Sequence, residues 1–140
     1  MLTTETNEVG GVPTIIQEEL SVQIPNEEVQ SVVKLNNDQM NAYNIIMNAI
    51  HEKQGQVFFV DGPGGTGKTF LYRTIMANLR RNNEIVLATA SSSIAATLLP
   101  GGRTAHSRFG IPIDIEHHSI CKIAKNSDLE KLIRITNKII

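Results

Sequence analysis

The chain has 140 residues, of which 41% are hydrophobic, and its formal net charge is −1. This length suits a single domain, and the apolar content is sufficient for a core. The sequence has neither the run of ~18 apolar residues that a membrane-spanning helix needs nor the start of a secretory signal. A single cysteine, Cys121, excludes an internal disulfide and fits a reducing compartment. We therefore expect a soluble, intracellular protein without a membrane partner, in the nucleus or, as the alternative, in the mitochondrion.

The charge is distributed unevenly along the chain. Residues 1–33 carry six acids and neither Lys nor Arg, whereas residues 34–140 carry thirteen bases and eight acids. The acidic part also contains glycines and prolines, which interrupt helices and strands. We predict that residues 1–34 form a poorly ordered acidic leader, with a short helix near residues 27–33. The alternative is an extra strand or helix that packs on the core.

Two elements are expected between the leader and residue 60. Asn36 with Gln39 three residues later is the signature of a capping box, which predicts the start of a helix. Apolar residues then recur at helical spacing to about residue 53, at Met40, Tyr43, Met47 and Ile50. The β-branched and aromatic run at residues 57–60 predicts a short strand.

Residues 62–69 form a complete G-x-x-x-x-G-K-[ST] pattern. The glycines of such a loop let successive backbone N–H groups point inward and bind an anion. We expect Lys68 to contact the β and γ phosphates of ATP, and the Thr69 hydroxyl to bind Mg²⁺. A chance match in a glycine-rich turn is the alternative, but a strand before the loop and a helix after it disfavour that interpretation. The predicted nucleotide-binding residues of this loop are Gly62, Pro63, Gly64, Gly65, Thr66, Gly67, Lys68 and Thr69.

Helices and strands continue to alternate after this loop. Leu71, Ile75 and Leu79 lie on one face of a helix predicted over residues 70–79. The basic residues 80–81 are interpreted as its solvated end, where they suit the helix dipole. The remaining elements are a strand at 84–88, a short helix at 94–99, a helical turn at 104–109, an extended segment at 111–113, a helix at 128–135 and a strand opening at 138–140. This order is typical of an α/β fold with a parallel sheet.

Three blocks of sequence resemble one family. Residues 35–39, residues 62–69, and residues 88–96 together with 101–109 are similar to the motor core of superfamily-one DNA helicases of the petite-integration-frequency type, which includes the Helitron helicases. Residues 121–123 and 127–129 also look like family sequence. The resemblance implies a P-loop NTPase (RecA-like) fold, a three-layer sandwich with a parallel sheet that is incomplete at the C-terminus. Residues 35–140 would be the N-terminal part of the helicase ATP-binding domain, truncated before the Walker B motif.

The same resemblance implies the activity and the partners. The family is an ATP-driven motor that moves along single-stranded DNA, unwinds duplex DNA at junctions, usually 5′ to 3′, and serves DNA repair, recombination and telomere maintenance. Gln39 would contact adenine, since a side-chain amide can pair with the donor and acceptor edge of that base. Residue spacing alone instead favours Gln39 as a helix-capping residue.

The candidate DNA contacts lie in the third block. Arg103 can bind a phosphate, Ser and Thr hydroxyls can bond phosphates without reading sequence, and Phe109 can stack a base. Phe109 as a core ring and His106 as a capping or core histidine are the alternatives. The candidate DNA-binding residues are Ser92, Arg103, Thr104, His106, Ser107 and Phe109.

Hydrolysis requires groups beyond the phosphate loop: carboxylates for Mg²⁺ and for the attacking water, and an arginine for the transition state. Residues 111–116 are the nearest candidate for the Mg²⁺ carboxylate, but Pro112 disfavours a central strand there. The resemblance implies that these groups follow residue 140, so we expect nucleotide binding without hydrolysis or unwinding by this chain alone. The alternative is a non-catalytic nucleotide-binding remnant of a truncated helicase gene. A small-molecule kinase lacks an evident acceptor site, and the His117-His118-x-x-Cys121 cluster is interpreted as a polar loop.

Overall fold

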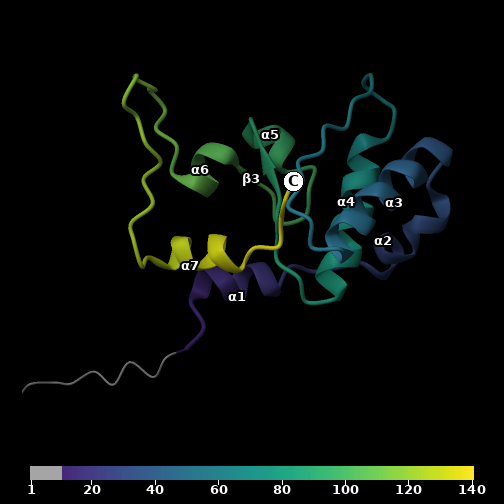
Figure 1. Ribbon diagram of the computed structural model, residues 1–140, viewed down its shortest axis with the longest axis horizontal. Coiled ribbons are helices and arrows are strands. Elements are labelled where there is room, and N and C mark those ends of the chain that lie inside the picture. Colours follow the sequence, from purple (N-terminus) through teal and green to yellow (C-terminus); the bar gives the residue numbers. More distant parts are fainter. Residues whose placement is uncertain (1–10) are drawn as a thin grey trace, which may run out of the picture.

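The computed structural model of the protein describes residues 11–140, which form helices around short parallel strands (Figure 1). Among these residues, no helix has the length and the apolar character needed to cross a membrane. The N-terminal part contains helix α1 (Thr14–Leu20), helix α2 (Asn26–Gln30), the 3-10 helix η1 (Ser31–Lys34) and helix α3 (Asn37–His51). The remainder contains helix α4 (Lys68–Arg81), strands β1 (Val86–Leu87) and β2 (Thr89–Ala90), helix α5 (Ser93–Ala96), strand β3 (Arg103–Thr104), helices α6 (Ala105–Phe109) and α7 (Asp128–Ile135), and strand β4 (Lys138–Ile139).

One extended run, residues 85–90, organises the strands. β1 pairs in parallel with β4, and β2 pairs in parallel with β3. The backbone of residues 85, 87 and 89 bonds toward β4, whereas the carbonyl of Ala88 accepts from the N–H of Arg103 on the other side. The parallel pairing predicted from the sequence is therefore present, in ladders two residues long. The finer expectation, a three-layer sandwich, stays a prediction.

Side chains of this run alternate between two apolar clusters. Val86 and Ala88 belong to a cluster with residues of α3 and α4, whereas Ile85 and Leu87 pack with residues of α1 and α7. Successive side chains of a strand point to opposite faces, so one short run contributes to both clusters. Figure 1 shows the corresponding helices in pairs, α3 beside α4 and α1 beside α7.

The two longest helices of the described range follow the sequence prediction. Asn36 and Gln39 form a full capping box at the start of α3, in which each side chain accepts from the other residue's backbone N–H at 2.9 Å. The apolar face of α3 packs against α4. In α4, Leu71, Ile75 and Leu79 are each at most 2% exposed, which is the face that their spacing predicted.

Residues 11–34 differ from the poorly ordered leader that composition predicted. They contain α1, α2 and η1, and Ile16 and Glu19 of α1 are buried. Arg73 of α4 donates to Glu28 of α2, with 2.8 Å between Nε and Oε1, so α2 is attached to α4. The short helix expected near residues 27–33 is confirmed, and so is the alternative of an added helix on the core. Residues 1–10 of the predicted leader lie outside the described range.

The strand predicted at residues 57–60 is absent. Val57 is 100% and Phe59 91% exposed, and no backbone hydrogen bond from the described residues reaches this segment. It borders an apolar cleft of about 630 Å³, which Ile139 and Ile140 also line. The local sequence favours extended backbone, but a strand is defined by its partner, and none lies beside this segment in the described part of the chain.

The later elements lie where the sequence predicts them, except that α5 ends at Ala96 and does not reach residue 99. Ser127 caps α7 through a bond from the Glu130 N–H to its hydroxyl, at 3.2 Å. The predicted helical turn is α6, and the extended connection from α6 to α7 occupies the left side of Figure 1. β4 supplies the predicted strand next to β1.

Candidate nucleotide-binding site and DNA-facing surface

The glycine-rich loop has the backbone shape that an anion-binding turn requires. Gly65 and Gly67 both have φ of +81°, a left-handed conformation that side chains disfavour. At Gly62, an added Cβ would lie 2.9 Å from the Thr66 hydroxyl, which itself donates to the Pro63 carbonyl at 2.7 Å. The glycines at positions 62, 65 and 67 are therefore required by the backbone conformation of the loop itself.

Gln39 connects the start of α3 to this loop. Besides its place in the capping box, its amide nitrogen donates to the carbonyls of Thr66 at 3.4 Å and Gly67 at 3.3 Å. The contact is so close that a Cβ on Gly67 would lie 2.3 Å from the Gln39 amide nitrogen. The structure thus shows the capping role and a second role in positioning the loop. The adenine contact implied by the resemblance stays a prediction.

The Lys68 side chain bonds back to the start of the loop. Its ammonium group donates to the carbonyls of Gly62 and Pro63, the latter at 3.0 Å. The lysine is the first residue of α4, so its charge is held at the positive end of the helix dipole. A cation at this position, surrounded by backbone dipoles, is suited to an oligophosphate.

The N-terminus of α4 provides the remaining donors. Its N-cap is Gly67, which leaves the first turn without a side-chain cap from the described residues. Such N–H groups bind phosphate oxygens, and α4 is 14 residues long. Thr69 lies exposed in this first turn, where its hydroxyl is accessible to a Mg²⁺ ion carried by the nucleotide. The donor set of residues 62–69 therefore fits a magnesium–triphosphate group.

The candidate DNA contacts converge on neighbouring elements. Ser92 caps α5, and Thr104 caps α6 by accepting from the Ser107 N–H at 3.2 Å. α5 and α6 each contact the paired strands β2 and β3. Ser92, Arg103, His106 and Ser107 are exposed. An exposed His106 excludes the core-histidine alternative.

The structure shows the surroundings of Phe109 and of the basic pair at residues 80–81. Phe109 is half-buried and packs against the cluster of Ile16 and Leu132, which agrees with the core alternative. Arg80 is 8% exposed, so its interpretation as a solvated helix end is wrong, whereas Arg81 is exposed as expected. Burial lowers the pKa of Arg80, an effect that the nearby Glu19 carboxylate opposes.

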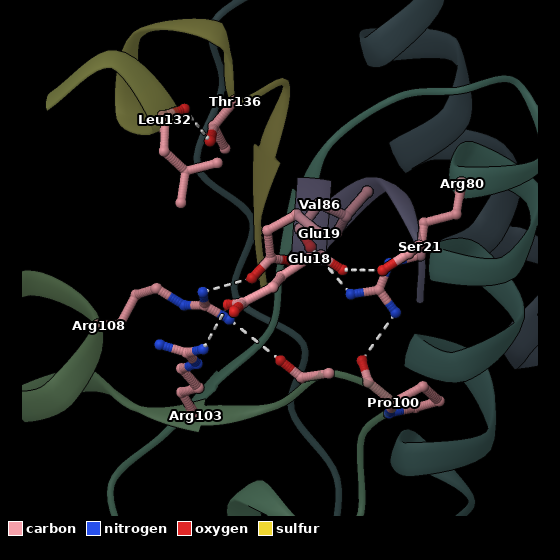
Figure 2. A network of polar contacts seen from close by, with 11 residues as sticks. Glu18, Glu19, Ser21, Arg80, Val86, Pro100, Arg103, Arg108, Leu132 and Thr136 are labelled. Carbon is pink, nitrogen blue, oxygen red and sulfur yellow. Dashed lines mark hydrogen bonds and ion pairs between the residues drawn. The ribbon is translucent and has the colours of Figure 1, made fainter. Parts of the chain in front are cut away.

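Sequence reasoning missed a buried polar network below this surface (Figure 2). Arg108 donates to Glu19 at 2.5 Å and to the Gly101 carbonyl at 3.0 Å. Arg80 donates to the carbonyls of Pro100 at 2.7 Å and Val86 at 3.0 Å. The sequence contained one signal of this network: Glu19 lies three residues after Ile16 and so shares its helix face. A charged residue on an apolar face implies a buried partner.

Comparison with known proteins decides the family. The sequence model of the PIF1-like helicases matches residues 34–140. The chain belongs to this family. The family resemblance inferred from the sequence motifs is therefore confirmed. The matched range includes Gln39, the phosphate loop and every candidate DNA contact.

Individual relatives of this PIF1-like chain are DNA helicases. ATP-dependent DNA helicase PIF4 of Trypanosoma brucei brucei (strain 927/4 GUTat10.1) is 32% identical over 87 residues, which cover 62% of this chain and 10% of that protein. ATP-dependent DNA helicase Pif1 of Bdellovibrio bacteriovorus is 41% identical over 61 residues, 44% of this chain and 13% of the relative. PIF3 of the same trypanosome is 40% identical over 60 residues, 43% of this chain and 7% of the relative. The PIF1-like chain thus spans about a tenth of the length of these relatives.

Proposed function

We propose that this chain is the ATP-binding portion of an ATP-dependent DNA helicase that moves 5′ to 3′ on single-stranded DNA. Its family and the names of its relatives support the activity class. In this proposal the strands and helices described above are part of a P-loop NTPase sandwich, with residues 35–140 as the N-terminal part of the motor domain. Action at duplex junctions, in repair, recombination or telomere maintenance, and residence in the nucleus or mitochondrion belong to the same proposal.

The geometry of the loop at residues 62–69 carries the nucleotide half of the proposal. Two left-handed glycines turn the chain into an uncapped helix N-terminus, and the Lys68 ammonium lies across the loop. When a triphosphate binds, the ammonium would exchange its carbonyl partners for β and γ phosphate oxygens. Mg²⁺ would neutralise charge between those phosphates, with Thr69 as its protein ligand.

In this proposal, ATP hydrolysis requires groups other than the residues of the phosphate loop. A water must be oriented and deprotonated, and the transition-state charge must be stabilised, by carboxylates and an arginine. The sequence candidates Asp114 and Glu116 lie exposed in the connection between α6 and α7, on the opposite side of Figure 1 from α4. We therefore propose that the 140-residue chain binds ATP and does not turn it over.

The DNA half of the proposal rests on the exposed residues of β3, α5 and α6. Arg103 supplies charge for a phosphate, while the side chains of Ser92, His106 and Ser107 are accessible on adjacent elements. Contacts of this kind bind the backbone of DNA without reading its sequence. The packing of Phe109 favours phosphate contacts over base stacking as the main source of affinity.

Titration of the 140-residue chain with a fluorescent ATP analogue and Mg²⁺ tests the nucleotide half. We expect saturable binding that falls about 10- to 100-fold in Lys68→Ala, since hydrogen bonds to charged groups contribute roughly 1.5–3 kcal/mol. Lys125→Ala removes the same charge from the exposed α6–α7 connection and should leave binding unchanged. Equal binding by the two variants would refute the site. Steady phosphate release by the wild-type chain, lost in Lys68→Ala, would refute the assignment of hydrolysis to other groups.

A further inference from the structure

Helix α1 is attached to the DNA-facing segment by two neighbouring acids. Glu19 binds Arg108 of α6, and Glu18 binds Arg103 of β3 with 3.3 Å between Oε2 and Nη2 (Figure 2). We call these two ion pairs the α1 contact. They join residues 85 and 89 positions apart in the sequence, so they fix how the N-terminal helix lies on the candidate DNA surface.

The Glu19 half of the α1 contact is buried. The Arg108 and Glu19 side chains are 1% and 6% exposed. Arg108 also donates to the Gly101 carbonyl, and Arg80 donates to the adjacent Pro100 carbonyl. These two hydrogen bonds stabilise the turn before β3. A buried carboxylate paired with a buried arginine is not exchanged for an external anion unless α1 detaches, because the arginine would be left buried without its partner.

The Glu18 half is exposed and exchangeable. The Arg103 and Glu18 side chains are 44% and 56% exposed. A solvent-exposed ion pair contributes about 0–1 kcal/mol, because water and salt screen it. Successive residues of a helix point in different directions, so the docking of Glu19 determines where Glu18 lies. Glu18 therefore presents a carboxylate to Arg103, an exposed cation of the candidate DNA surface, from a backbone position that is already fixed.

We propose that Glu18 is a competitor for DNA at this surface: α1, held in place by Glu19 and Arg108, neutralises Arg103 until a DNA phosphate displaces the Glu18 carboxylate. The inference rests on the DNA half of the proposed function and adds the regulation of that site. Both a carboxylate and a phosphate are anions that bind a guanidinium through its N–H groups. The two acceptors compete for the charge and the Nη2 hydrogens of Arg103, so the acidic helix lowers the affinity of the surface for DNA.

Fluorescence anisotropy with a labelled oligothymidylate of about 20 nucleotides measures this competition, because such DNA offers phosphates without base pairing. Glu18→Gln in the 140-residue chain removes the charge and keeps the shape. We expect binding about two- to fivefold tighter at low salt, which corresponds to an exposed ion pair. The gain should shrink as salt rises from about 50 to 200 mM. Glu27→Gln removes an equal charge from exposed α2 and should not change affinity.

Arg103→Ala completes a double-mutant cycle with Glu18→Gln. It should weaken binding and reduce the slope of log affinity against log salt by about 1, the contribution of one phosphate contact. In the Arg103→Ala background, Glu18→Gln should give no gain, because the two substitutions act on one interaction. A gain that persists in that background, or an equal gain from Glu27→Gln, would overturn the competition.

The outcomes separate the two proposals. Binding by the wild-type chain that Arg103→Ala weakens, together with an unchanged Glu18→Gln variant, would overturn the competition and leave the DNA surface in place. Absence of binding in the wild-type chain and in Glu18→Gln would overturn both.

Discussion

Replacement of Glu19 by Ala tests whether the N-terminal helix is an integral part of the fold. The substitution leaves Arg108, with a side chain 1% exposed, without its carboxylate partner and next to the buried Arg80. Removal of one member of a buried ion pair costs about 3–5 kcal/mol. Small domains are stable by roughly 5–15 kcal/mol in total, so this one substitution removes a large share.

Urea unfolding followed by circular dichroism gives the measurement. With an m value of roughly 1–3 kcal/mol/M, a loss of 3–5 kcal/mol lowers the unfolding midpoint by about 2 M. Glu18→Ala is the matched control, because it removes the neighbouring acid from an exposed pair and should cost less than about 1 kcal/mol. Should Glu19→Ala leave too little folded protein, Glu19→Gln keeps an oxygen acceptor for Arg108 and should show a smaller loss in the same direction.

Equal stability of the Glu19→Ala and Glu18→Ala variants would refute this reasoning. The helix would then contribute nothing by docking, and the leader would behave as its acidic composition predicts. Protection of the α1 amides from hydrogen exchange gives an independent readout, since an undocked helix of seven residues would not be protected.

Two further substitutions test the loop and its support. Gly67→Ala introduces a side chain at φ +81° and places its Cβ 2.3 Å from the Gln39 amide; we expect a loss of about 1–2 kcal/mol in urea unfolding and weaker binding of the ATP analogue. Gly55→Ala, where the added Cβ meets nothing within 4 Å, is its control, and an equal effect would contradict the argument. Asn36→Ala removes the side-chain acceptor of the capping box and should cost about 0.5–2 kcal/mol in the same assay. The control Asn44→Ala, at an exposed position inside α3, should not destabilise, because alanine favours a helix more than asparagine does; identical losses would mean that the cap contributes nothing.

Elements set by local sequence could be predicted from the sequence. The capping box of Asn36 and Gln39, the buried face of α4 and the Ser127 cap of α7 depend on residues within one or two helical turns of each other. The left-handed glycines of the phosphate loop likewise follow from the motif. In each case the interaction that fixes the backbone lies within the segment that shows the pattern.

Features that depend on distant residues could not be predicted. The docking of α1 requires Arg108, 89 residues away, and nothing near Glu19 identifies that partner. The burial of Arg80 depends on the carbonyls of Pro100 and Val86, which only the folded chain brings together. The prediction at residues 57–60 failed for the same reason, since extended backbone becomes a strand only beside a partner.

The extended run at residues 85–90 has a mechanical consequence. Its even-numbered side chains, Val86 and Ala88, rest against the layer that holds the phosphate loop, and its odd-numbered ones, Ile85 and Leu87, against the layer of α1 and α7. On one edge it is also bonded to β3, which leads directly into α6. A shift of this single ribbon by one residue would turn every side chain toward the wrong layer. The register of this run therefore fixes how the α3–α4 side of the structure is placed relative to β3 and α6.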